Sequence, residues 1–369
     1  MLSRTQNVLC SGLIGLLVAV PAVAQNRAAA GIGAGYESYT FKDENVVGIR
    51  SITLLTAPFA ARIPLGSRVW LEATGAWARG ELERADGSVA TLAGLTDTQV
   101  ALGLAIVPDR LSIALVGLAP TGTAEQNAEE AEVAGAIAAD LIPFRISNWG
   151  SGGGIGVTTT IAHSFGRVGA GISGAYLVGR EFDLLEAQEF AYRPGDQLVI
   201  RGALDATVGS AGKLGLQLTL QQAKEDQVNG SNLYRPGRRY QVIGSYQFAM
   251  GQSSGVVYGG AMHRAQGTFL LETGSDAPAQ DLILVGGGLR IALGRSVVFA
   301  PGGDLRLQRR ADGTDQGYSA GVGGSIELGS TVKLIPSVRG RFGNVLVREG
   351  IETGFSGLDA GLTLRFGGR

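Results

Sequence analysis

Alternation of apolar and polar residues with a period of two is the feature of this chain that most restricts its fold. From Leu214 to Leu220 every second residue is leucine, and Gly215, Gln217 and Thr219 stand between them. A helix with 3.6 residues per turn would scatter these leucines around its surface, whereas a strand places them all on one face. The chain is therefore predicted to form amphipathic β-strands.

The alternating segments are longer than the strands of ordinary soluble proteins. They recur at 198–208, 318–328, 332–342 and 358–366. Many run to about ten to fourteen residues, which a tilted strand needs to cross a bilayer, whereas soluble strands centre on about five or six. After residue 25 no segment resembles a transmembrane helix. A soluble, secreted β-protein would also alternate, so segment length is what favours membrane strands.

Short turns alternate with longer polar loops along the chain. The turns, rich in residues suited to tight reversals, include Pro108-Asp109-Arg110 and Gly294-Arg295. The expected loops include Gly80 to Leu95, Thr121 to Asn148, Asp183 to Gly195 and Glu225 to Gly237. Outer-membrane barrels have short periplasmic turns and longer extracellular loops. We therefore expect an all-β fold, a transmembrane antiparallel up-and-down β-barrel of about sixteen strands, with fourteen as the alternative.

Residues 1–24 are predicted to be a cleaved signal peptide. Arg4 supplies a positive start, and the apolar run from Leu9 to Val20 ends just before Ala24. That run is shorter than the roughly 20 residues that a membrane-spanning helix needs. Residues 25–369 would then form the barrel in the outer membrane of a bacterial cell. Cys10, the one cysteine, lies in the signal peptide, so the mature chain would have neither disulfides nor thiolate metal sites.

Enzyme and nucleic-acid functions have little support in the sequence. The formal net charge of -1 gives no basic face for nucleic acid. The two histidines, His163 and His263, have no second histidine or carboxylate at a metal-ligand spacing. The glycine run Gly150 to Gly156 continues into a strand, where a phosphate-binding loop would need a helix. We expect no catalytic residues, no metal and no cofactor.

The polar faces of the predicted strands carry charged residues that lipid would not tolerate. We therefore expect them to line the lumen: Arg201, Asp205, Arg290, Asp304, Arg306, Glu327, Lys333, Arg339, Arg341, Asp359 and Arg365. In a water-filled pore such charges would favour anions or zwitterions, and in a closed barrel they would pair across strands. The long loop, which carries the acids Glu125, Glu129, Glu130 and Glu132, is expected at the outer end, either as a solvated surface loop or folded inward as a constriction or short helix.

The segment from Thr98 to Phe182 resembles the outer-membrane proteins linked to phenol meta-cleavage pathways, which are related to the fatty-acid transporters. The resemblance is carried by Pro120-Thr121-Gly122, a corner between a strand and a long outer loop, and by the glycine-rich strand that follows. It implies passive uptake of small hydrophobic or aromatic compounds. The Asn-Pro-Ala hatch signature of the fatty-acid transporters is missing from Gln25 to Gly35.

Two functional hypotheses remain open at this point. The first is an outer-membrane channel or transporter for passive uptake of small solutes. The second is a structural or adhesive barrel with an occluded lumen. In both, the expected partners are outer-membrane lipid and the barrel-assembly machinery. The first hypothesis adds a small-molecule solute, and the sequence specifies no oligomeric state.

Overall fold

The computed structural model describes residues 28–138, 141–185, 188–270, 276–294, 296–310, 315–348 and 351–367. The predicted signal peptide lies outside this part of the chain. Nearly all of the secondary structure is strand, and the two helices are α1 (Glu44–Val47) and α2 (Ala128–Ile137). Neither of these described helices is long and apolar enough to cross a membrane.

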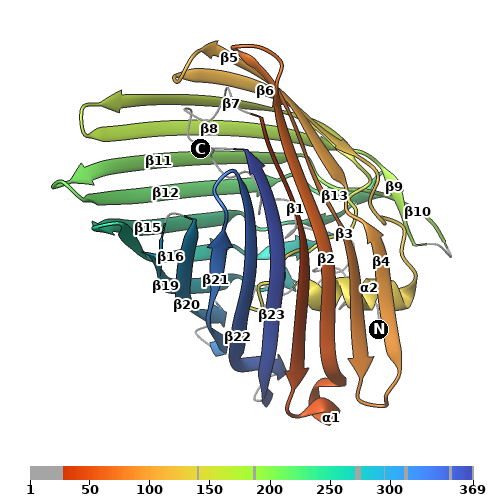
Figure 1. Cartoon of the computed structure of the whole chain (residues 1–369). Helices are drawn as coiled ribbons and strands as arrows, with labels where there is room; N and C mark the ends of the chain where they lie inside the picture. The colour runs from red at the N-terminus through yellow and green to blue at the C-terminus, as the bar shows by residue number, and fades with distance from the viewer. Residues whose placement is uncertain are drawn as a thin grey trace.

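The main sheet closes on itself as an antiparallel barrel (Figure 1). The first strand, β1, pairs with β2 on one side and with the last strand, β23, on the other. The strands of the barrel are β1 (Ala29–Phe41), β2 (Ile49–Pro64), β3 (Val69–Arg84), β4 (Val89–Leu95), β5 (Thr98–Val107), β6 (Leu111–Ala119), β7 (Gly154–Phe165), β8 (Val168–Gly179), β11 (Gln197–Val208), β12 (Gly212–Ala223), β15 (Arg239–Met250), β16 (Ser253–Arg264), β19 (Gln280–Ala292), β20 (Val297–Arg310), β21 (Asp315–Leu328), β22 (Val332–Arg348) and β23 (Ile351–Gly367). β4 and β5 pair with successive parts of β3, so the ring has 16 strands and the predicted number is confirmed.

The turns at one end of the barrel are short, as the sequence predicts. In three of them Gly166, Gly209 and Gly251 have φ values of 64°, 63° and 61°. This left-handed region is open to glycine without steric cost, which lets the chain reverse within a few residues. The end with short turns corresponds to the periplasmic end of an outer-membrane barrel, and the end with longer connections to the outer end.

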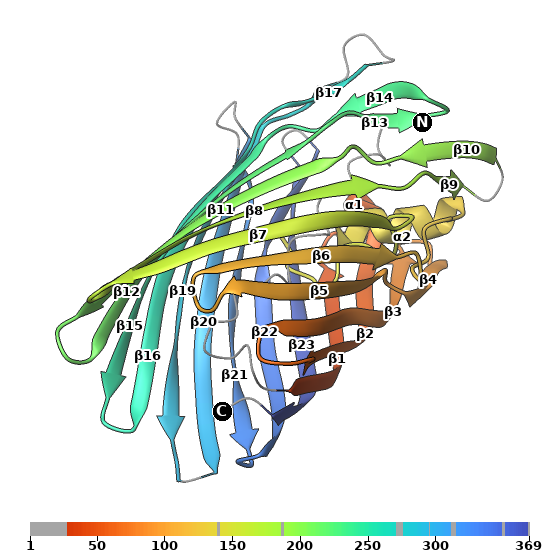
Figure 2. The same cartoon turned by 90° about the horizontal axis from the view of Figure 1, so that it is seen from above.

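A second sheet prolongs the barrel wall at its outer end (Figure 2). It consists of β9 (Phe182–Leu185), β10 (Gln188–Arg193), β13 (Asp226–Val228), β14 (Ser231–Arg235), β17 (Gly267–Phe269) and β18 (Asp276–Ala277). The segments 183–195 and 225–237, expected as loops, thus contain paired strands, and 80–95 is a hairpin of β3 and β4. Beyond the membrane the outward face meets no lipid, so its residues can be polar, as Glu81 and Glu83 are on β3.

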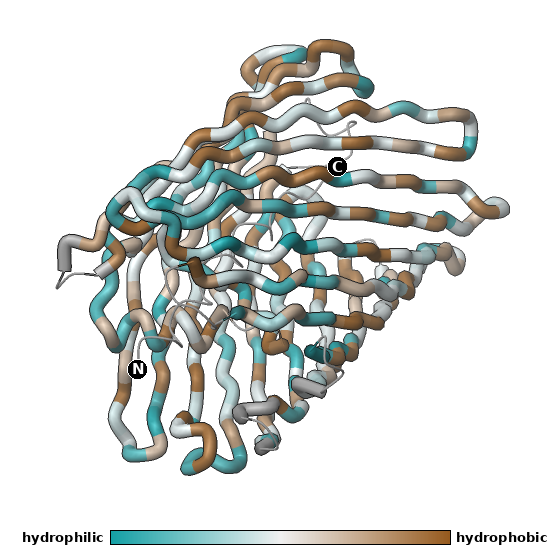
Figure 3. The backbone as a smooth tube through the Cα atoms, turned by 180° about the vertical axis from the view of Figure 1, so that it is seen from behind, coloured by the Kyte–Doolittle hydropathy of each residue, from teal (hydrophilic) through white to brown (hydrophobic). Residues whose placement is uncertain are grey.

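Hydrophobic and hydrophilic residues alternate along the strands of the barrel wall (Figure 3), and the exposure of their side chains shows on which face each set lies. Leu214, Leu216 and Leu218 of β12 point outward and are 49%, 37% and 52% exposed. The apolar side chains of the other membrane strands are exposed on the same outer face, as in Val257 and Val285. An exposed apolar band around a closed barrel is stable only against lipid.

The first strands reverse this pattern in their outer halves. Tyr39 of β1 and Leu54 of β2 point inward and are buried, while Ser38 and Thr53 point outward and contact each other at 3.3 Å. The inner face is apolar here because another part of the chain covers it from within the barrel. The covering segment defines the candidate site.

Candidate functional site

A long connection between β6 and β7 folds into the barrel and lies against its inner wall. We call residues 120–153 of this connection, as far as they are described, the strap. The Ser319 hydroxyl of β21 donates to the backbone carbonyl of Leu141 at 3.1 Å, and the indole Nε1 of Trp149 donates to the carbonyl of Ala78 on β3 at 3.3 Å. The strap therefore crosses the inner wall from β21 past the closing seam of the barrel to β3.

Apolar burial attaches the strap to the wall. Helix α2 begins at Asn127, whose side chain accepts from the backbone N–H groups of Glu129 and Glu130. It packs on β3 and β4 through a buried cluster that also includes wall residues. The cluster comprises Tyr39, Phe41, Ile52, Leu54, Ala78, Leu82, Ala90, Leu92, Val133, Ala134, Ile137, Leu141, Ile142, Trp149 and Phe355. The strap is thus a packed part of the structure and fills one side of the lumen.

Arg145 of the strap contacts both strands of the closing seam. Its backbone N–H donates to Glu37 Oε2 of β1 at 3.0 Å, and its guanidinium pairs with Asp359 of β23. The guanidinium lies directly over Gly35 and Gly361, where a Cβ atom would come within 2.6–3.0 Å of it. A larger residue at either position would collide with the guanidinium of Arg145. Nothing in the loop sequence around Arg145 indicates these distant partners, so its role could not be predicted from the sequence.

The acidic residues of the strap lie toward its outer end. Glu130 accepts from the backbone N–H of Asn127 at 2.9 Å, and Glu132 pairs with Arg84 of β3 at 2.6 Å. Glu125 and Glu129 are exposed. The acids predicted as a constriction are therefore divided between capping α2, pairing with the wall and facing solvent, and Arg145 is the charged residue that reaches the seam.

The charged residues predicted for the lumen all lie on the inner face of the wall, opposite the exposed apolar side chains. Most of them gather into two networks on β19 to β22. In one, Asp304 Oδ1 accepts from Arg339 at 2.7 Å and from Arg341 at 2.9 Å, and Arg306 lies 3.6 Å from Oδ2. One carboxylate thus faces three guanidinium groups, which leaves a surplus of positive charge.

The second network lies nearer the short turns. Glu327 of β21 pairs with Arg290 of β19 at 2.5 Å and with Lys333 of β22 at 3.4 Å. The arginine side chain is 50% exposed, whereas Glu327 is only 14% exposed. Here too one carboxylate pairs with two cations, and both cations face the lumen. Arg365 faces Lys333 across the β22–β23 pair, and Arg201 and Asp205 lie farther round the wall on β11.

The opposite wall carries no charge of this kind. Strands β5 to β8, which stand half the ring away from β19 to β22, contain no Asp, Glu, Lys or Arg in their described sequences. Many of their inward residues are small or hydroxylic, such as Ser112, Thr158, Thr160 and Ser173, and others, such as Val116 and Leu118, are apolar. The lumen therefore has one basic side and one uncharged side.

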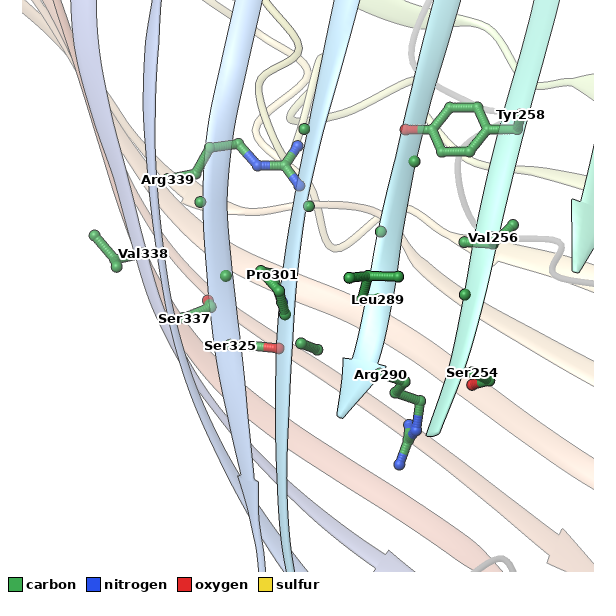
Figure 4. A pocket seen from close by; sticks show the side chains of 18 of the residues that line it. Ser254, Val256, Tyr258, Leu289, Arg290, Pro301, Ser325, Ser337, Val338 and Arg339 are labelled. Carbon is green, nitrogen blue, oxygen red and sulfur yellow. The ribbon is translucent and has the colours of Figure 1, made fainter. Parts of the chain in front are cut away.

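A cavity of about 670 Å³ opens from the lumen onto the basic side (Figure 4). Its base is formed by the backbones of three strands, because Gly288, Gly302 and Gly323 face each other in register across β19, β20 and β21. Arg290 and Arg339 stand at its edges, with hydroxyl groups such as that of Ser325. The volume lies within the range of small-ligand sites, about 300–1,000 Å³.

The outer sheet holds one strongly perturbed carboxyl group. Asp226 of β13 is 4% exposed, and its Oδ1 accepts from the backbone N–H of Gly195 at 2.8 Å. Burial raises its pKa to about 6, although the hydrogen bonds from Gly195 and Tyr192 act in the opposite direction. The group lies outside the membrane strands and far from the basic side of the lumen.

Both histidines point to the outside of the barrel. His163 packs edge-on against Phe165 near a short turn, and His263 Nδ1 lies 2.7 Å from Asp281 Oδ1 at the outer end. No group of three metal-ligating side chains occurs within the described part of the chain. Neither histidine is close to the lumen networks.

Comparison with solved structures gives the fold. The chain is similar to OprB of Pseudomonas putida at 9% identity, with a TM-score of 0.51 and coverage of 94% of this chain and 95% of that one. It also matches DcaP, an outer-membrane channel of Acinetobacter baumannii (7% identity, 93% and 98% coverage, TM-score 0.41), and the Rhodopseudomonas blastica porin (13%, 92% and 100%, TM-score 0.38). No family model and no curated protein matches the chain. The fold is that of a bacterial outer-membrane barrel, and the phenol meta-pathway group is not confirmed.

Proposed function

We propose that this chain is a passive outer-membrane channel for small polar solutes, without catalytic activity. The observation that carries the proposal is the half-filled lumen: the strap covers β1 to β4 and the seam, while the inner face of β15 to β22 borders a cavity of about 670 Å³. A barrel without transport has no need of a charged, glycine-lined space inside it. Pores with such linings pass solutes by size and charge.

The polar lining bears on the kind of solute. The inward groups of the cavity lining include arginines, serines, Gln247 and Tyr258, as well as Asp359, Val256 and Ala300, and its base is backbone. Such a surface, rich in charged and hydroxyl groups, favours polar solutes over the hydrophobic or aromatic compounds implied by the resemblance. Contact with outer-membrane lipid and insertion by the barrel-assembly machinery belong to the same proposal.

Ion conductance and solute uptake test the proposal directly. The mature chain, refolded in detergent and inserted in planar bilayers, is expected to give stable single-channel currents in KCl. Liposomes containing it should swell in small polar solutes such as glycine. Heat-modifiable migration on gels serves as the control for folding. A folded barrel that neither conducts nor permits swelling would contradict the proposal and favour the structural or adhesive alternative.

A further inference from the structure

The basic side of the lumen has cations that the wall does not need for its own stability. Arg341 and Asp304 are each only 3% exposed, so their pair is an internal part of the wall. Arg339, bonded to the same carboxylate, is 41% exposed, and Arg290 is 50% exposed. Arg341 can hold Asp304 and Lys333 can hold Glu327, which makes the two exposed guanidinium groups, of Arg339 and Arg290, available to the lumen.

The bare base of the cavity separates these two arginines. Gly288, Gly302 and Gly323 are in one register, and Gly323 pairs with Arg339 on β22. We call these three glycines the glycine floor. Arg290 lies two residues beyond Gly288 on β19, at the other end of the floor (Figure 4). With strands about 4.8 Å apart and a rise of about 3.3 Å per residue, the two arginine Cα atoms are about 16 Å apart.

This spacing suits a ligand with charges at both ends. In the structure Arg339 bonds to Asp304 and Arg290 bonds to Glu327, and the Arg290 guanidinium points away from the floor (Figure 4). Turned over the floor from its opposite ends, the two side chains would leave room between them for a short carbon chain. No side chain projects from the floor to obstruct it. The carboxylate near the cavity edge, Asp359, is already paired with Arg145, so it does not cancel the two arginines. Each guanidinium can form charge-assisted hydrogen bonds with a carboxylate.

The uncharged wall on the opposite side of the lumen strengthens the attraction of anions to the basic side. With cations on β19 to β22 and no charge on β5 to β8, the field across the lumen draws anions toward the floor. The whole chain has a formal net charge of -1, so this field reflects the placement of charges and not an overall basic composition.

We propose that the lumen is anion-selective and that it binds small organic dicarboxylates over the glycine floor, with one carboxylate at Arg290 and the other at Arg339. This rests on the proposed channel function and names its class of solute. The structure assigns Arg341 and Lys333 a different task, which is to keep Asp304 and Glu327 paired.

Two measurements on the conducting wild-type channel test the proposal. In a KCl gradient the reversal potential is expected to show that chloride is more permeant than potassium. Succinate should then reduce the chloride current in a saturable manner. Butyrate, with one carboxylate, should be at least about tenfold weaker, and succinamide, the neutral analogue, should have no effect.

Variants locate the binding groups. Arg290→Gln and Arg339→Gln are each expected to weaken the succinate block about tenfold or more and to reduce the preference for chloride. In each variant the remaining carboxylate still has a cationic partner, Lys333 for Glu327 and Arg341 for Asp304, so both variants should fold. The matched control is Arg79→Gln, because Arg79 pairs with Glu81 on the outward side of β3 and its loss changes the net charge equally.

The outcomes separate this inference from the proposed function. A conducting channel that prefers potassium, or that succinate and butyrate affect equally, overturns the dicarboxylate site and leaves the channel proposal standing. A folded barrel without any current contradicts the channel itself. If an arginine variant fails to fold, the wild-type comparison of succinate, butyrate and succinamide still decides the question.

Discussion

Replacing Trp149 by alanine should release the strap from the barrel wall. The indole is fully buried against the inner face of β3, near Gly80, and donates to the carbonyl of Ala78. Removing a buried tryptophan side chain costs about 3–5 kcal/mol. At about 1.4 kcal/mol per factor of ten, the population of detached strap should rise by roughly one hundred to a few thousand fold.

Limited trypsin digestion can measure that population. Arg145 lies in the strap between the contacts made by Leu141 and Trp149, and the peptide bond after it can enter a protease only when the strap leaves the wall. When detachment is fast relative to cleavage, the rate of cleavage follows the detached population. Cleavage after Arg145, followed by mass spectrometry on folded protein in detergent, should accelerate by the factor given above.

The control is a tryptophan on the other face of the same strand. Trp77 points outward from β3 and is 41% exposed, so Trp77→Ala removes an equal side chain without touching the strap. It should leave cleavage after Arg145 unchanged. The reasoning is refuted if Trp149→Ala, still folded by heat-modifiable migration, is cleaved there less than about threefold faster than the wild type, because burial of the indole would then not hold the strap.

Three further perturbations have defined outcomes. Asp359→Asn removes the ion pair of Arg145, but the pair is partly exposed and worth about 1 kcal/mol or less, so cleavage in the strap should rise by less than about tenfold. Gly103→Leu should displace the ring of Trp70, which lies over Gly103, and lower the temperature of heat modification through overpacking of about 1–3 kcal/mol. Asp226→Asn should abolish a pH dependence of the stability of the outer sheet. Burial raises the pKa of Asp226 from 3.8 to about 6. The stabilisation of the folded hairpin by the protonated carboxyl is therefore complete below about pH 4 and is lost as the pH rises through about 6. Hydrogen exchange at β13 should show this loss in the wild type and not in the variant.

Each of these perturbations has its own control and contrary result. Gly117→Leu, on β6 beside β5, places a side chain where only the Val100 carbonyl lies within 4 Å, at 3.9 Å, and should leave the temperature of heat modification unchanged. Equal effects of the Gly103 and Gly117 replacements would show that the ring contact is unimportant. A strap released as fully by Asp359→Asn as by loss of Trp149 would assign its attachment to charge. Exchange at β13 that is independent of pH would contradict the effect of burial on Asp226.

The membrane strands could be predicted because lipid imposes a local rule on them. Every second residue of β12 must be apolar whatever its partners are, so the leucines at 214–220 reveal both the strand and its outward face. The inward position of Arg339 and Asp304 follows from the same parity. The alternation does not predict that Arg339 and Arg341 share one carboxylate, because this depends on the register between β20, β21 and β22.

The strap could not be predicted in the same way, because its structure depends on contacts far away in the sequence. Tyr39 and Leu54 reverse the alternation of β1 and β2 because a segment many residues later in the chain covers them. Arg145 has no local signal, as its partners Glu37 and Asp359 come from the two ends of the barrel. The hairpin of β3 and β4 was expected as a loop because its outer part is polar on the face that lipid never meets.

The position of Arg145 also bears on the order in which the barrel is assembled. β1 and β23 are the first and last strands to leave the ribosome, and they become neighbours only when the sheet closes. Arg145 bonds to a residue on each of them, so its two contacts can coexist only in the closed ring. A partly inserted chain with an open seam has one half of this contact at most. Arg145 can therefore complete both contacts only once the seam has closed, and it then joins the first and last strands from inside the barrel.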